Sequence, residues 1–169
     1  MTTLQNINHF TDEQFVDLFG GIFEHSPWVA QKSVLARPFV SLDAAFEAMR
    51  KVVEEASIDE KRTLILEHPE LGSRLSMSDH SVAEQAGAGL NALTADEFEV
   101  ITQLNKRYTE KFNFPFIIAV AGLDKHHIMQ EMERRLELDK TMEFNTALNE
   151  IYKIARIRFA AITESPAMT

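Results

Sequence analysis

The stretch ADEFEVITQLNKRYTEKF, residues 95–112, decides the fold class because its apolar side chains recur every three or four residues. The recurring apolar residues are Phe98, Ile101, Leu104, Tyr108 and Phe112. That spacing places them on one face of an α-helix, which turns once in about 3.6 residues. Thr94 and Glu97 have the spacing of a capping box, which starts such a helix. The stretch therefore predicts an amphipathic helix that packs on a core.

The same pattern extends along the chain in both directions. SLDAAFEAMRKVVEEA at 41–56 and TALNEIYKIARIRFAAI at 146–162 repeat the apolar spacing. Capping-box spacing recurs at Thr11 with Gln14 and at Ser57 with Glu60, and Ser26 stands as a possible cap before Pro27. We expect an all-α fold, a single compact domain over residues 1–169 with about eight helices. The expected helices lie near residues 11–19, 26–35, 41–55, 58–67, 79–91, 95–112, 125–138 and 140–163.

One segment departs from the helical pattern. FPFIIAV at 114–120 is rich in β-branched and aromatic residues, as strands are. A single strand has no partner to pair with, so the segment is either a buried helix or an extended connector. The longer apolar run at 114–123 reaches about half of the roughly 20 residues that a membrane-spanning helix requires. We therefore expect a core segment here and no membrane partner.

Composition excludes several classes of function. The 169 residues include 17 Lys and Arg against 26 Asp and Glu, and the formal charge of -9 disfavours a nucleic-acid partner. The chain has no cysteine, which excludes disulfides, thiolate metal sites and a cysteine nucleophile. The N-terminal MTTLQNINHFTDEQF has neither the basic nor the apolar region of a secretory signal. These observations together favour a cytoplasmic protein.

The stretch SVAEQAGAGL at 81–90 brings polar groups together on an expected helix. Ser81, Glu84 and Gln85 share one face, because they stand three and four residues apart. Gly87 and Gly89 each cost the helix up to about 1 kcal/mol relative to alanine, which fits the close approach of a ligand or another backbone. A solvated surface face is the competing interpretation, and composition alone favours it.

A histidine and two arginines are further candidates for chemistry. His68 precedes Pro69, and proline disfavours helical geometry at the residue before it, so His68 is expected at a helix end. There it could exchange protons near neutral pH, or be an ordinary capping or surface group. Arg156 and Arg158 interrupt the apolar face of the last helix. Each is either a snorkelling surface cation or a buried anchor for a substrate carboxylate.

Two other functions compete with an enzyme that binds a small molecule through these residues. His126, His127 and Glu131 could belong to a metal hydrolase. Adjacent histidines project about 100° apart on a helix, however, and no HExxH spacing occurs, so no metal site is expected. The non-enzymatic alternative is an acidic helical interaction module, which predicts no small-molecule site.

Five stretches resemble one family, the 2-oxo-4-hydroxy-4-carboxy-5-ureidoimidazoline (OHCU) decarboxylases of urate breakdown. They are SPWVAQKSVLARPFVSLDAAFEAM at 26–49, HPELGSR at 68–74, SVAEQAGAGL at 81–90, LNKRYTEKFNFPFIIAVAG at 104–122 and EIYKIARIRF at 150–159. The resemblance implies an all-helical homodimer that converts OHCU to (S)-allantoin and carbon dioxide without a cofactor. The absence of a cofactor is chemically reasonable, because the carbon that loses the carboxylate adjoins an imine-like C=N that can receive the electron pair.

The resemblance also assigns roles to individual residues. The catalytic histidine of the family matches His68, as general acid/base, and the active-site glutamate matches Glu84, which would orient the imidazole or a ureido nitrogen. Ser81 and Gln85 would position the ring and the ureido group, and Arg158 would hold the carboxylate. The remaining implied contacts are the backbone of Phe116, Ile117, Ile118 and Ala119, and an apolar surface from Pro69 and Phe39.

Overall fold

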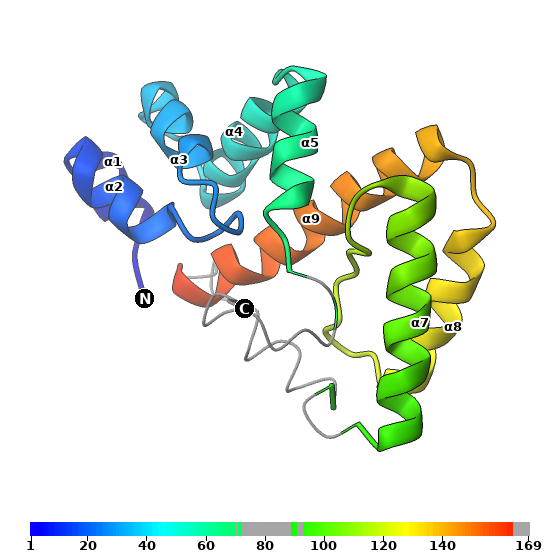
Figure 1. Ribbon diagram of the computed structural model, residues 1–169. Coiled ribbons are helices and arrows are strands. Elements are labelled where there is room, and N and C mark those ends of the chain that lie inside the picture. The colour runs from blue at the N-terminus through cyan, green and yellow to red at the C-terminus, as the bar shows by residue number, and fades with distance from the viewer. Residues whose placement is uncertain (70, 72–88, 91–92, 164–169) are drawn as a thin grey trace. The chain divides into compact units, whose positions relative to one another are not determined.

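The computed structural model describes residues 1–69, 71, 89–90 and 93–163 (Figure 1). These residues form eight α-helices and one 3-10 helix, with no strand among them, so the predicted all-α fold is confirmed. None of the helices in this part of the chain is long and apolar enough to cross a membrane. The chain divides into two compact units: Met1–Leu64 together with the chain from Tyr152 onward, and Ile65–Ile151.

The first unit is built mainly from helices of the N-terminal half. They are α1 (Leu4–His9), α2 (Asp12–Phe19), α3 (Trp28–Ser33), the 3-10 helix η1 (Val34–Ala36), α4 (Leu42–Glu54) and α5 (Ile58–Leu66), whose last two residues belong to the second unit. The predicted capping box of Thr11 and Gln14 starts α2. Phe159 stacks on Phe19 and contacts Phe46 at ring distances of 5.4 and 5.6 Å. Aromatic packing therefore forms the core of this unit.

Two sequence predictions in this unit were incomplete or wrong. Helix α1 was not predicted, because its six residues give too short an apolar pattern; Thr3 caps it by accepting the Asn6 N–H at 3.1 Å. Ser26 does not cap α3, which begins at Trp28. The Ser26 hydroxyl instead donates to the Glu24 carbonyl at 2.9 Å, in a turn where His25 has a φ of 49°. Ser26 therefore stabilises the turn that carries Glu24.

The second unit contains α7 (Ala95–Phe112), α8 (Lys125–Leu136) and the first part of α9 (Lys140–Ile162), whose residues from Tyr152 belong to the first unit. Helices α7 and α8 pack against each other (Figure 1). Thr94 and Glu97 form the predicted capping box of α7, and Asn113 ends the helix in the left-handed conformation, with a φ of 62°. The expected helix at 79–91 lies largely outside the described residues, but its predicted end is wrong, because Gly89 and Leu90 form a turn in which Gly89 has a φ of 81°.

The segment at 114–120 is a buried extended connector. Of the two alternatives left open by the sequence, the helix is wrong, because none of these residues is helical. Pro115 lacks an N–H and disfavours helical geometry at Phe114, directly after the left-handed Asn113. Tyr108 meets the ring of Phe116 edge-on at 5.2 Å, so the connector packs against α7.

Candidate active site

His68 lies just beyond the end of α5, as predicted. Its N–H donates to the Ile65 carbonyl at 3.2 Å, and the residue is only 7% exposed. Pro69 beside it is half-buried. This burial excludes the alternative in which His68 is a surface group. A buried imidazole is costly unless neighbouring groups form hydrogen bonds with it.

The backbone of residues 116–119 has both anchored and available polar groups. The Ile117 carbonyl accepts a hydrogen bond from Arg135 at 2.6 Å, and the Ala119 N–H donates to Glu150 Oε1 at 3.2 Å. Among the described residues, none accepts the N–H of Ile117 or Ile118, although these residues are only 3% and 7% exposed. Buried N–H groups in proteins nearly always have an acceptor. In an extended chain the Ile117 N–H shares the edge of the two anchored groups, whereas the Ile118 N–H faces the opposite edge, where a ligand could bind.

A buried polar cluster behind this segment was missed in the sequence. Arg135 donates from Nε to Glu143 Oε1 at 2.7 Å and also through Nη2, and Tyr108 donates to the same oxygen. Burial, followed by the bond to Glu143, raises the pKa of Tyr108 well above its ordinary value, so the hydroxyl stays protonated and donates. One signal was available: Arg135 stands seven residues after Ile128 and three after Met132, on the face that the sequence pattern marks as apolar.

The two arginines of the last helix have different surroundings, both within the first unit. Arg158 is 3% exposed and lies 3.0 Å from Glu24, and its Nη1 donates to the Ile22 carbonyl at 3.3 Å. Arg156 has a side chain that is 45% exposed and pairs with Asp43. Arg156 is thus the surface cation of the two, and Arg158 is the buried one. Glu24, which is fully buried, was not singled out in the sequence.

The structure does not describe all of the predicted site residues, and those that it describes fall into two units. Ser81, Glu84 and Gln85 lie outside the described residues. His68, Pro69 and the 116–119 backbone belong to the unit at 65–151, whereas Arg158 belongs to the other.

The family of this chain follows from a match to a protein-family model. Residues 8–160 match the family model described as OHCU decarboxylase. The chain belongs to the OHCU decarboxylase family. The resemblance seen in the sequence is confirmed.

Individual relatives agree with this assignment. The chain is 45% identical to a 2-oxo-4-hydroxy-4-carboxy-5-ureidoimidazoline decarboxylase of Haloferax volcanii, over 94% of each chain. It is 43% identical to the uric acid degradation bifunctional protein PucL of Bacillus subtilis, over 96% of this chain but 33% of that protein. A crystal structure of (S)-allantoin synthase superposes with a TM-score of 0.79 at 26% identity, covering 98% of this chain and 55% of that one.

The residues of the alternative metal hydrolase have other partners. His127 Nδ1 lies 2.9 Å from Asp124, and Glu131 accepts from Arg134 at 3.0 Å. Within the described ranges, no group of three or more His, Cys, Asp or Glu side chains is arranged to hold a metal ion. The geometry of these residues thus reflects helix capping and an ion pair within α8.

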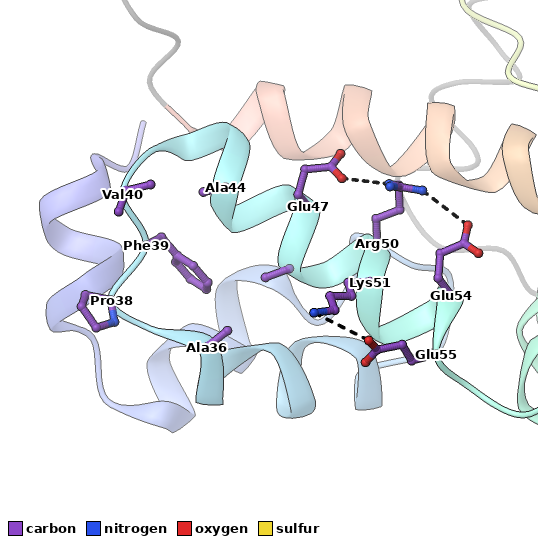
Figure 2. Close-up of a pocket in the computed structure, with 11 residues that line it drawn as sticks. Ala36, Pro38, Phe39, Val40, Ala44, Glu47, Arg50, Lys51, Glu54 and Glu55 are labelled. Atoms are coloured by element: carbon purple, nitrogen blue, oxygen red, sulfur yellow. Dashed lines mark hydrogen bonds and ion pairs between the residues drawn. The ribbon is translucent and has the colours of Figure 1, made fainter.

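The first unit also has an open groove of about 530 Å³ beside α4 (Figure 2). Pro38, Phe39 and Val40 form its apolar end, and this is where the structure places Phe39. The charged residues on the groove pair with one another: Arg50 with Glu47 and Glu54, and Lys51 with Glu55. The groove thus carries three carboxylates and two cations, and both cations are already paired with carboxylates, so neither is placed as a clamp for an anionic substrate.

Proposed function

We propose that this chain decarboxylates OHCU to (S)-allantoin and carbon dioxide in urate breakdown, without a cofactor. The observation that carries the proposal is a buried His68 at the family's catalytic position, in a chain that matches the family from residue 8 to residue 160. Within the second unit, the buried N–H of Ile118, on the edge opposite the anchored groups, adds a donor suited to a carbonyl oxygen of a ureido compound.

In the proposed reaction, the bond between the ring carbon and its carboxylate breaks and carbon dioxide leaves. The electron pair moves into the adjoining C=N, so the substrate supplies its own electron sink. The ring nitrogen that receives the electron pair is protonated, which leaves an enol. His68 then delivers a proton to one face of the neighbouring carbon, which carries the ureido group, while the hydroxyl of the decarboxylated carbon loses its proton and becomes the carbonyl. The face that is protonated sets the hand of the product. Glu84 orients the imidazole or a ureido nitrogen for this transfer. The contribution of the protein is positioning and hydrogen bonding, which need no metal.

Binding is proposed to come from several elements. Arg158 holds the substrate carboxylate, because a guanidinium can donate two parallel hydrogen bonds to it. Ser81 and Gln85 position the ring and the ureido group, and Pro69 adds an apolar surface beside the leaving carboxylate. The backbone of Phe116, Ile117, Ile118 and Ala119 completes the site.

The test is the variant His68→Asn, with His126→Asn as a matched control at an exposed position. Asparagine keeps a hydrogen-bonding group but cannot act as the acid. We expect turnover to fall by about 10² to 10⁴-fold while the melting temperature stays close to that of the parent. Circular dichroism follows the appearance of (S)-allantoin from freshly made OHCU, whose spontaneous decay gives a racemate. A fully active, stereoselective His68→Asn protein would remove His68 from the mechanism.

The setting of the enzyme is part of the proposal. We propose a cytoplasmic homodimer in which residues 1–169 form one family domain. Sedimentation equilibrium of the purified chain should give twice the monomer mass, and a monomeric active protein would contradict the dimer. Activity should also survive exhaustive chelation, since the chemistry needs no metal. Loss of turnover with a chelator, restored by a divalent ion, would contradict the cofactor-free mechanism.

A further inference from the structure

The 116–119 segment is held by two side chains that contact alternate residues. Arg135 donates to the Ile117 carbonyl at 2.6 Å, and Glu150 accepts the Ala119 N–H at 3.2 Å. In an extended chain, the carbonyl of one residue and the N–H of the second residue after it face the same edge. The peptide groups of the residue between them, Ile118, face the opposite edge. The two anchors therefore leave one edge of the segment available for a ligand.

Arg135 is itself fixed from several sides. Its side chain is 1% exposed, and Nε and Nη2 both donate to Glu143 Oε1, which also accepts the Tyr108 hydroxyl. The guanidinium lies 4.3 Å from the centre of the Phe116 ring. Arg135 thus contacts the 116–119 segment twice, at the ring of Phe116 and at the carbonyl of Ile117. A planar cation with this many partners cannot shift without breaking several contacts at once.

We propose that Arg135 and Glu150 are positioning residues that hold the 116–119 backbone in the geometry that binds substrate. Neither side chain reacts, and each acts through a main-chain group. This inference rests on the proposed function, because it takes the backbone of Phe116 to Ala119 as one side of the OHCU site. It gives Arg135 and Glu150 a role, since neither residue takes part in the proposed reaction itself.

The first experiment compares Arg135→Lys with Arg134→Lys, its neighbour on α8. Lysine keeps the charge at Arg135 but has a single ammonium group in place of the fork that reaches both Glu143 and Ile117. Arg134 has a side chain that is 58% exposed and pairs with Glu131 on the same helix, so its replacement is the control. We expect Arg135→Lys to speed hydrogen exchange at the Ala119 amide by about tenfold in the absence of substrate. It should also raise KM for OHCU by about tenfold, with a smaller change in kcat.

The second experiment uses Glu150, which is half-buried and easier to replace without unfolding the chain. Glu150→Ala removes the acceptor of the Ala119 N–H, whereas Glu150→Gln keeps an oxygen that can accept it. We expect Glu150→Ala to raise KM and to speed exchange at Ala119, and Glu150→Gln to restore both. Rescue by the amide would show that the hydrogen bond, and not the charge, positions the segment.

The results separate this inference from the proposed function. If the parent protein leaves OHCU to decay to a racemate, the proposed function fails, and the exchange rates at Ala119 still test the anchors. If the parent is active but Arg135→Lys and Glu150→Ala leave KM unchanged, the two residues do not position the site. Unchanged exchange at Ala119 in both variants would overturn the inference whatever the activity.

Discussion

Each unit buries an arginine–glutamate pair, and the two pairs differ in how tightly the guanidinium is bound. In the second unit, Arg135 reaches Glu143 at 2.7 Å and the Ile117 carbonyl at 2.6 Å. In the first unit, Arg158 lies 3.0 Å from Glu24, and its contacts to the carbonyls of Ile22 and Gly21 are 3.3 and 3.5 Å long. Charge-assisted bonds of this kind are commonly about 2.7–2.9 Å long. The contacts of Arg135 are therefore as short as such bonds usually are, and the described contacts of Arg158 are longer.

This difference separates two uses of the same chemistry. Short bonds to fixed acceptors suit an arginine that holds the backbone in place. The described contacts of Arg158 are longer, which suits a guanidinium that shares its donors between Glu24 and a further carboxylate. Burial alone would not distinguish them, since Arg135 and Arg158 are 1% and 3% exposed. The partners and their distances make the distinction.

The largest expected effect is on stability, from Arg135→Met. The change removes the partner of Glu143, which is fully buried, and breaking such a pair costs about 3–5 kcal/mol. Urea unfolding measures the loss, with Arg134→Met as the exposed control, for which we expect a change within about 0.5 kcal/mol. If Arg135→Met lowers the free energy of unfolding no more than Arg134→Met does, Arg135 is not bound more tightly than Arg158.

A smaller effect, on substrate binding, is expected from Arg158→Lys. Lysine keeps the charge but cannot donate the two parallel bonds that hold a carboxylate, so KM should rise by about 10- to 100-fold. The change Arg158→Met would also remove the guanidinium partner of Glu24 and mix a stability loss into the result. Arg156→Lys, at the exposed position two residues earlier, is the matched control. Equal KM values for the two lysine variants would remove Arg158 as the clamp.

Much of the fold could be predicted because its signals are local. The predicted helices whose two ends both lie in the described residues agree with the structure to within two residues at each end, and capping boxes mark where several begin. Helix α1 was missed because six residues hold less than two turns of pattern. The connector at 114–120 stayed ambiguous, since apolar runs of this length suit either a helix or an extended chain.

The candidate site was predictable only in part. His68 carried a local signal in the proline that follows it, and burial supports that interpretation. The partners Glu24 and Glu143 carried none, because each pairs with an arginine that is distant in the sequence or on another helix, and a single sequence does not reveal such pairing. Without those partners, the sequence could not distinguish Arg158 from Arg156. The distinction came from distances and exposure.

The smallest expected effect concerns an ion pair near the surface, between Glu97 and Lys125 at 2.7 Å. The hydrogen bond from Lys125, followed by that from the Thr94 backbone, lowers the pKa of Glu97 from its ordinary 4.5 to about 2. A lowered pKa stabilises the fold above pH 4.5, and this contribution is lost as the pH falls toward 2.

Glu97→Gln tests this assignment, because glutamine keeps the capping-box acceptor and removes only the charge. We expect a slightly lower melting temperature than that of the parent at neutral pH, with the difference shrinking below pH 4.5. A difference that stays constant down to pH 2.5 would assign the effect to capping instead. In that case the Glu97–Lys125 ion pair would contribute nothing measurable to stability, and only the two buried arginine–glutamate pairs would.

The contact between Thr2 and the end of α9 has a practical consequence for handling this protein. The Thr2 N–H donates to the Ile162 carbonyl at 3.0 Å, and carbonyls at the end of a helix otherwise lack a partner within it. Ile162 stands one turn after Arg158, so the first residues of the chain help to secure the turn that carries the proposed clamp. A deletion that removes Thr2 would take this donor away from the last turn of α9. Variants of Arg158 are therefore best compared in a protein that keeps residues 1–3.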